Sequence, residues 1–161
     1  MTAAPARLPE IAADPRLIVP LDLPTAAEAR AMVEALGESV SFYKVGLELF
    51  ATGDGMALAR ELKAAGKQVF LDWKLHDIGT TVQRSAAVLA ESGCDLLTVH
   101  GEPQVMEAAV RGRGRSGLKI LAVTVMTSPP TTTSRKWATA PASRRWCSVA
   151  FTRRCTQDAT G

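Results

Sequence analysis

The sequence lacks the features that define several protein classes. No run of 18 residues is free of charged side chains, which argues against a membrane-spanning helix. The only cysteines are Cys94, Cys147 and Cys155, and no two of them form a CxxC pair. An odd number of widely spaced cysteines argues against a disulfide scaffold and fits a reducing compartment. With only His76 and His100 to assist them, a structural zinc site is not expected.

The N-terminal segment has little apolar character. Residues 1–15 are rich in Ala and Pro but contain Arg7, Glu10 and Asp14, so they lack the continuous apolar stretch of a secretory signal. We therefore interpret them as an N-terminal extension and expect a cytoplasmic protein without a membrane partner.

Charge is distributed unevenly along the chain, whose net charge is +3. Residues 129–161 contain six basic side chains and one acidic one, which is 6 − 1 = +5, and residues 1–128 therefore carry 13 − 15 = −2. Nucleic-acid contact would depend on this basic tail alone, and no nucleic-acid partner is expected.

From about residue 16, short apolar segments alternate with helical patterns, which indicates an α/β fold with a parallel sheet. The helices have recognisable ends, such as the Thr25–Glu28 capping box, the stop at Gly37 and Pro103 at a first helical position. Pro20 is a misfit because it removes a donor from the first strand. The predicted strands are Arg16–Asp22, Val40–Gly46, Gln68–Lys74, Asp95–His100 and Lys119–Val125.

The repeating pattern stops after Ser128. Residues 129–161 contain Pro129-Pro130, a run of threonines and paired arginines, without the apolar periodicity of a strand or a helix. We interpret this tail as out-of-frame translation or a fused scar, and residues 16–128 as the folded domain.

Polar side chains recur where the apolar strands end. In parallel α/β barrels these carboxyl ends form the rim on which active sites are built. Five successive strands with such residues at the same end therefore indicate an enzyme site. The residues are Asp22, Lys44, Asp72, Lys74, His100, Thr127 and Ser128.

Asp72 and Lys74 form the most informative pair in this set. They are two residues apart on a strand, so their side chains should share one face and neutralise each other in a largely buried setting. Lys44 and Asp77 could complete an alternating array. A structural ion pair is the simpler alternative, but four charges are a costly way to gain stability, which favours chemistry. His76 and His100 could be acid/base groups, although we favour a structural hydrogen-bonding role for both.

Four motifs resemble the orotidine 5'-phosphate decarboxylase family, in family order and with approximately family spacing. The resemblance covers residues 16–128. The motifs are SFYKVG at 41–46, FLDWKLHDI at 70–78, LTVH at 97–100 and VTVMTS at 123–128, with Leu21-Asp22 upstream.

The resemblance implies about five of the eight units of a (β/α)8 TIM barrel of the ribulose-phosphate-binding type. It implies a homodimeric lyase of pyrimidine biosynthesis that converts orotidine 5'-phosphate to UMP and CO2 without a metal or organic cofactor. By position, Lys74 would protonate C6 of the pyrimidine and Asp72 would lie beside the departing carboxylate, with Lys44 and Asp77 completing the array.

The resemblance assigns further substrate-binding positions. Asp22 and Lys44 match residues that bind the ribose hydroxyls. Thr127 and Ser128 match positions beside the pyrimidine. The positions that match residues reaching into the neighbouring subunit's site are Asp77, Ile78 and Thr81.

The chain also departs from the family pattern. Gly79-Thr80 replaces a usual Pro-Asn, and no segment matches the arginine-bearing phosphate loop of a complete barrel. We therefore expect little activity from this chain by itself. One alternative is a magnesium-dependent sugar-phosphate decarboxylase or aldolase of the same superfamily, although such enzymes carry Glu in place of Lys44. Another is a non-catalytic, degenerate paralogue.

Overall fold

The computed structural model describes residues 12–124. The chain divides into two compact units, residues 1–70 and 71–161, and the division falls within strand β3. The strands of the described residues form one sheet in chain order, β1-β2-β3-β4-β5, with helices between them. This arrangement is the predicted α/β alternation. Within residues 12–124, none of the helices has the length and apolar character needed to cross a bilayer.

The first unit contains a parallel strand pair. β1 pairs with β2 so that Pro20 lies opposite Lys44, and the Leu21 amide donates to the Lys44 carbonyl at 2.9 Å. Tyr43, Val45 and Leu21 are fully buried there. The elements of this unit are β1 (Val19–Pro20), α1 (Ala26–Leu36), a 3-10 turn (Gly37–Ser39), β2 (Phe42–Gly46), α2 (Leu47–Ala51) and α3 (Gly55–Ala64).

The ends of α1 confirm the sequence prediction. The Thr25 hydroxyl accepts a hydrogen bond from the Glu28 amide at 3.2 Å, and Gly37 follows the last turn with a φ of 52°. Arg30 of α1 and Glu61 of α3 form an ion pair at 2.7 Å. The hydrogen bonds from Arg30 hold the pKa of the Glu61 carboxyl below its ordinary value.

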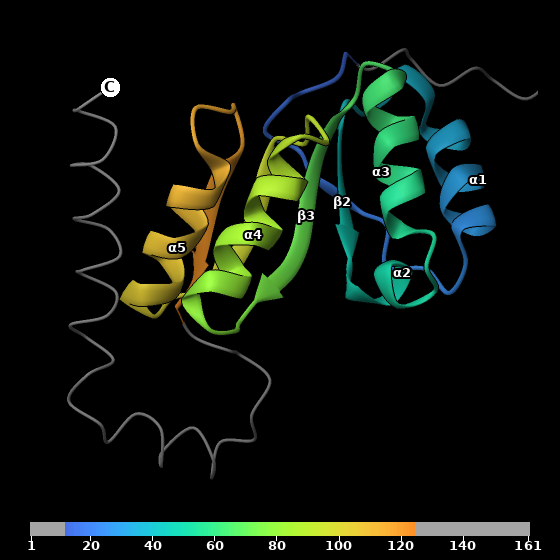
Figure 1. Ribbon diagram of the computed structural model, residues 1–161. Helices are drawn as coiled ribbons and strands as arrows, with labels where there is room; N and C mark the ends of the chain where they lie inside the picture. The colour runs from blue at the N-terminus through green and yellow to red at the C-terminus, as the bar shows by residue number, and fades with distance from the viewer. Residues whose placement is uncertain (1–11, 125–161) are drawn as a thin grey trace, which may run out of the picture. The chain divides into compact units, whose positions relative to one another are not determined.

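The second unit begins within β3 (Gln68–Leu75) and continues with four elements: α4 (Gly79–Ala90), β4 (Leu96–His100), α5 (Pro103–Arg113) and β5 (Lys119–Val123). β4 and β5 pair in parallel along their whole length. Helices α4 and α5 pack side by side (Figure 1). Their approach is so close that a Cβ on Gly112 would overlap the Gln83 carbonyl oxygen and lie 2.9 Å from the Ala86 Cβ.

The first predicted strand is wrong in its extent. It was predicted over Arg16–Asp22 but covers only Val19–Pro20. Asp14 is responsible for the late start, because its carbonyl accepts from the Leu17 amide and its carboxylate binds the Arg16 side chain in a turn. Pro20 then has no amide to continue the ladder.

The other strands begin or end within one or two residues of prediction, and Val125 lies outside the described residues. The sequence did not predict α2. Its five residues are too few to show a helical period, although Leu49 within it is fully buried.

Candidate active site

The first unit holds one pair of predicted site residues. The Lys44 ammonium lies 2.9 and 3.0 Å from the two carboxylate oxygens of Asp22. The Lys44 side chain is 20% exposed and that of Asp22 is 51% exposed, so the pair opens to solvent on the acid's side. Gly46 keeps the space free, because a Cβ there would lie 2.8 Å from Asp22 Oδ1. The pair presents both a hydrogen-bond donor and an acceptor, which suits recognition of neighbouring hydroxyl groups.

The second unit holds the other pair. Lys74 Nζ donates to Asp72 Oδ1 at 2.9 Å, which confirms the prediction that the two side chains share a face of the strand. The Asp72 side chain is 14% exposed and that of Lys74 is 32% exposed. The setting is therefore partly buried, less enclosed than the flanking apolar residues suggested.

Thr98 on β4 connects the two members of this pair. Its hydroxyl accepts from the Lys74 backbone amide at 3.0 Å and donates to Asp72 Oδ1 at 2.9 Å. Thr98 is only 7% exposed. One hydroxyl therefore fixes both the backbone of the lysine and the orientation of the carboxylate, a role that the sequence did not predict. The available signal was its position in the LTVH motif.

Lys74 also has an unusual backbone conformation. Its φ is 50°, and within residues 12–124 it is the one non-glycine residue with a positive φ. The Cβ atom makes this left-handed conformation unfavourable by about 1–3 kcal/mol. Such strain persists where the surrounding structure enforces it, and it concentrates at functional sites.

The residues after β3 form a separate feature. Asp77 Oδ1 accepts from the Ile78 amide at 2.6 Å, and Ile78 is 72% exposed. A hollow of about 140 Å³ lies beside them, lined by Leu75, His76, Asp77, Thr81, Val82 and Ser85. Ligand pockets usually measure roughly 300–1,000 Å³, so this hollow alone is too small for a nucleotide. The exposure of Ile78 fits its predicted contact with a second subunit.

The predicted array consists of Lys44, Asp72, Lys74 and Asp77. Within it, the contact of Lys74 with Asp72 lies in the second unit, whereas Lys44 of the first unit contacts Asp22. That Lys44 and Asp77 join Asp72 and Lys74 in one alternating array stays a prediction. The predicted pyrimidine-contacting residues at 127 and 128 lie outside the described residues.

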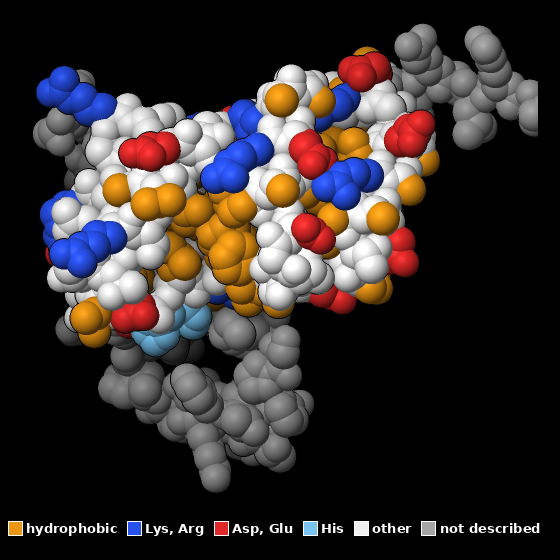
Figure 2. Space-filling view, turned by 45° about the vertical axis from the view of Figure 1, so that its right-hand side comes forward, with side chains coloured by type: hydrophobic (Ala, Val, Ile, Leu, Met, Phe, Trp, Pro, Cys, Tyr) orange, Lys and Arg blue, Asp and Glu red, His pale blue; other side chains and the backbone are white. Residues whose placement is uncertain are grey.

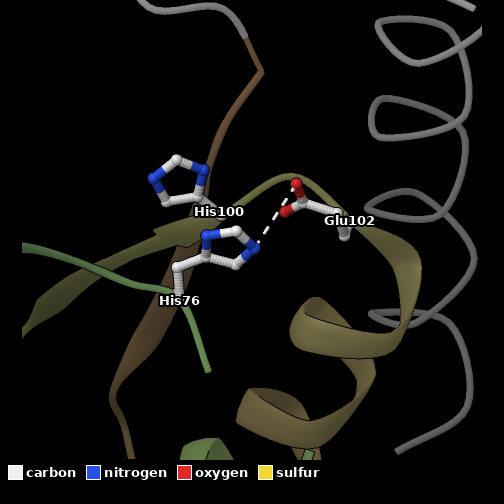
Figure 3. Close-up of side chains that lie close together, drawn as sticks. All are labelled: His76, His100 and Glu102. Carbon is white, nitrogen blue, oxygen red and sulfur yellow. Dashed lines mark ion pairs between the residues drawn. The ribbon is translucent and has the colours of Figure 1, made fainter. Parts of the chain in front are cut away.

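Both histidines of the chain come together at the ends of neighbouring strands. The rings of His76 and His100 stack with their centroids 4.4 Å apart and 18° between their planes. His76 Nε2 lies 3.6 Å from Glu102 Oε1 (Figure 3). Figure 2 shows the histidine side chains in pale blue at the surface, next to an acidic side chain. The sequence analysis did not predict that Glu102 would join them.

Comparisons with known proteins agree on one family. The model of the orotidine 5'-phosphate decarboxylase / HUMPS family matches residues 15–149, a match that extends into the tail. Proteins named orotidine 5'-phosphate decarboxylase are 77% identical in Caulobacter vibrioides over 116 residues and 59% identical in Rhodopseudomonas palustris over 113 residues. These alignments include 72% and 70% of this chain but 49% and 48% of the relatives, so the chain spans about half their length.

Solved structures give the same result. The crystal structure of orotidine 5'-phosphate decarboxylase from Lactobacillus acidophilus has a TM-score of 0.67 and 34% identity, covering 78% of this chain and 59% of that one. An uncharacterized conserved protein from Geobacillus kaustophilus has a TM-score of 0.72 and 33% identity, covering 83% of this chain and 67% of that one. The five strands of the described residues, with the helices between them, thus belong to a known α/β barrel fold.

Proposed function

The chain belongs to the orotidine 5'-phosphate decarboxylase / HUMPS family, and on this basis we propose that its site decarboxylates orotidine 5'-phosphate to UMP. One observation carries the proposal. The Lys74 ammonium is held 2.9 Å from Asp72 at a strand end whose backbone is in the left-handed region. The relatives that carry the decarboxylase name support the same choice.

Lys74 has the central chemical role in the proposed reaction. When the bond between C6 and the carboxylate breaks, its electron pair remains on C6, where the pyrimidine ring cannot easily delocalise it. A fixed ammonium stabilises this charge and then transfers its proton to C6, which completes UMP as CO2 leaves. Asp72 would lie beside the substrate carboxylate and favour its departure. This route uses neither a metal nor an organic cofactor.

The remaining site residues would bind the substrate. Asp22 and Lys44 would hold the ribose hydroxyls, a role supported by their bidentate contact at a half-exposed position. We further propose a cytoplasmic homodimer in which one subunit completes the site of the other through Asp77, Ile78 and Thr81. The pyrimidine would lie beside Thr127 and Ser128.

Lys44 favours this reaction over the magnesium-dependent sugar-phosphate reactions of the same superfamily. Those enzymes carry Glu at this position, whereas this chain places an ammonium there, 2.9 Å from Asp22. An ammonium cannot ligate a magnesium ion, which prefers carboxylate and water oxygens.

We propose that residues 16–128 are the decarboxylase domain and that 129–161 form a basic tail, into which the family match continues as far as residue 149. A complete barrel has eight strands and binds phosphate after the seventh and eighth, whereas residues 12–124 supply five strands. The 161-residue chain alone should therefore release little CO2. CO2 release by the purified chain at the rate of the Caulobacter vibrioides enzyme would contradict this expectation.

A hybrid enzyme tests the assignment directly. Residues 15–124 of this chain would replace the aligned half of the Caulobacter vibrioides relative, and CO2 release from orotidine 5'-phosphate would be measured. We expect an active hybrid, loss of turnover in Lys74→Ala with nucleotide binding retained, and full activity in Lys119→Ala, which removes an exposed lysine at the other end of a strand. A folded but inactive hybrid, or an active Lys74→Ala hybrid, would refute the proposal.

A further inference from the structure

The structure assigns a binding site for a zinc-class divalent metal ion to His76, His100 and Glu102. The candidate ligand atoms of these three residues all lie within 4.8 Å of one another. The site does not depend on the proposed function, because none of the three residues was given a role in the decarboxylation.

The fold brings these residues together from three adjoining segments of one unit. His76 directly follows β3, His100 is the last residue of β4, and Glu102 is the residue before the first turn of α5. Parallel strands end at the same edge of a sheet, so residues 24 positions apart in the sequence become neighbours. The chain contains only these two histidines.

The geometry is close to that of a coordinated ion. Ligands lie about 2.0–2.2 Å from zinc, which for a tetrahedral ion places neighbouring ligand atoms roughly 3.3–3.5 Å apart. The distance from His76 Nε2 to Glu102 Oε1 is 3.6 Å. The His76 side chain is 55% exposed, so its ring can turn out of the stack and aim its nitrogen at the shared point (Figure 3).

The electrostatics of the cluster favour a cation. Glu102 Oε2 is buried without a hydrogen-bond partner within residues 12–124, and the carboxylate makes no side-chain hydrogen bond to the start of α5. A buried carboxylate oxygen without a hydrogen-bond partner is unfavourable, and a bound cation would offset this cost. Imidazole nitrogens are common metal ligands and could donate to the same cation.

The donor set identifies the class of ion. Two imidazoles and one carboxylate suit zinc and its neighbours in the transition series, whereas magnesium prefers oxygen ligands alone. Three protein ligands leave one position for water at the exposed side. This inference departs from the expectation of no metal, which rested on the lack of a CxxC pair, on the presence of only two histidines and on the family resemblance. The competing explanation is an ion pair between protonated His76 and Glu102 that binds no metal.

The test measures zinc binding to the full 161-residue chain after removal of metal with EDTA. Because the thiols at 147 and 155 would also bind zinc, the measurement uses a Cys147→Ser/Cys155→Ser background. We expect one equivalent of zinc to bind, with weak binding of magnesium. In nitrogen-15 NMR of the histidine-labelled chain, the ring-nitrogen resonances of both histidines should shift as that equivalent of zinc binds.

Variants separate the proposed site from adventitious binding. His76→Ala and Glu102→Gln should each weaken zinc binding at least about tenfold, while Glu91→Ala, at an exposed position on another helix end, should leave it unchanged. His76 is exposed enough that its loss should preserve the circular dichroism spectrum. Zinc binding that is absent, or equal in His76→Ala and its background, would overturn the inference.

Zinc binding and CO2 release also test the metal site and the proposed decarboxylase function separately. Zinc binding without CO2 release by the hybrid would leave the metal site standing and refute the proposed function. CO2 release by the hybrid, without zinc binding to the chain, would do the reverse.

Discussion

Replacing Thr98 by Val tests the hydroxyl that holds the Asp72–Lys74 pair. Valine has almost the same shape as threonine, so the substitution removes two hydrogen bonds without opening a cavity. The Lys74 amide loses its acceptor at 3.0 Å, and the Asp72 carboxylate loses a donor at 2.9 Å. Because Thr98 is only 7% exposed, water has little access to replace either bond.

The expected loss of stability follows from the broken hydrogen bonds on one side and the added methyl group on the other. An unsatisfied buried amide is unfavourable by about 1–3 kcal/mol, and a hydrogen bond to a charged group contributes about 1.5–3 kcal/mol. The added methyl of valine returns at most about 0.8 kcal/mol. The hydrogen bonds dominate, so the free energy of unfolding should fall by about 2–5 kcal/mol.

Urea unfolding followed by circular dichroism would measure this change, and amide hydrogen exchange would locate it. The Lys74 amide should exchange faster in Thr98→Val than in the parent chain. Thr98→Ser keeps the hydroxyl and loses only a methyl, so its Lys74 amide should remain protected. In the hybrid enzyme, Thr98→Val should lower kcat more than it changes KM, because a misplaced ammonium weakens interactions made in the transition state.

A stable Thr98→Val chain with unchanged exchange at Lys74 would refute the reasoning. It would mean that the strained backbone of Lys74 is enforced by something other than this hydroxyl. Equal loss of protection in the Ser and Val variants would have the same meaning, because Ser keeps the hydroxyl that Val lacks.

Two further predictions concern stability. Gly112→Ala should lower the unfolding midpoint in urea, because overpacking against the Gln83 backbone (about 1–3 kcal/mol) outweighs the gain in helix propensity (about 1 kcal/mol). Gly117→Ala, whose added methyl would meet open space, should not lower it. Equal midpoints in the two variants would contradict this prediction. Arg30 holds the pKa of Glu61 below 4.5, so the ion pair stabilises the fold above that pH and this contribution is lost as the pH falls through the lowered pKa. Glu61→Gln should remove this part of the dependence of stability on acid pH. A variant whose stability changes with pH as the parent's does would contradict the prediction.

Local periodicity explains what the sequence could predict. A period of two places Asp72 and Lys74 on one face whatever surrounds them, and the structure confirms that contact at 2.9 Å. The cap at Thr25 is likewise decided within four residues. Such features depend only on residues close together in the chain, so they can be predicted from a single sequence.

Features that depend on the register between strands could not be predicted from the sequence. His76 and His100 stack because β3 and β4 end together, and no spacing rule links two residues so far apart. Thr98 lies in an apolar strand, where a threonine is ordinarily a packing residue. The extent of the first strand depended on an Asp14 turn that competes with the sheet.

The backbone of Lys74 favours the proposed chemical role of its ion pair over the structural alternative that the sequence left open. A structural alternative exists in the same chain. Lys67 is 8% exposed and binds the Gly37 carbonyl at 3.0 Å and the Glu38 carboxylate at 3.2 Å, without a positive φ.

Lys67 therefore shows that this chain satisfies a buried ammonium without strain when only stability is required. Lys74 is more exposed, yet it takes a conformation that is unfavourable by about 1–3 kcal/mol, and its amide is held there by the hydrogen bond that it donates to the Thr98 hydroxyl. A pair kept only for stability would gain by relaxing. The strain is accounted for if the position of the ammonium matters more than its energy, as it does for a group that must deliver a proton to one carbon.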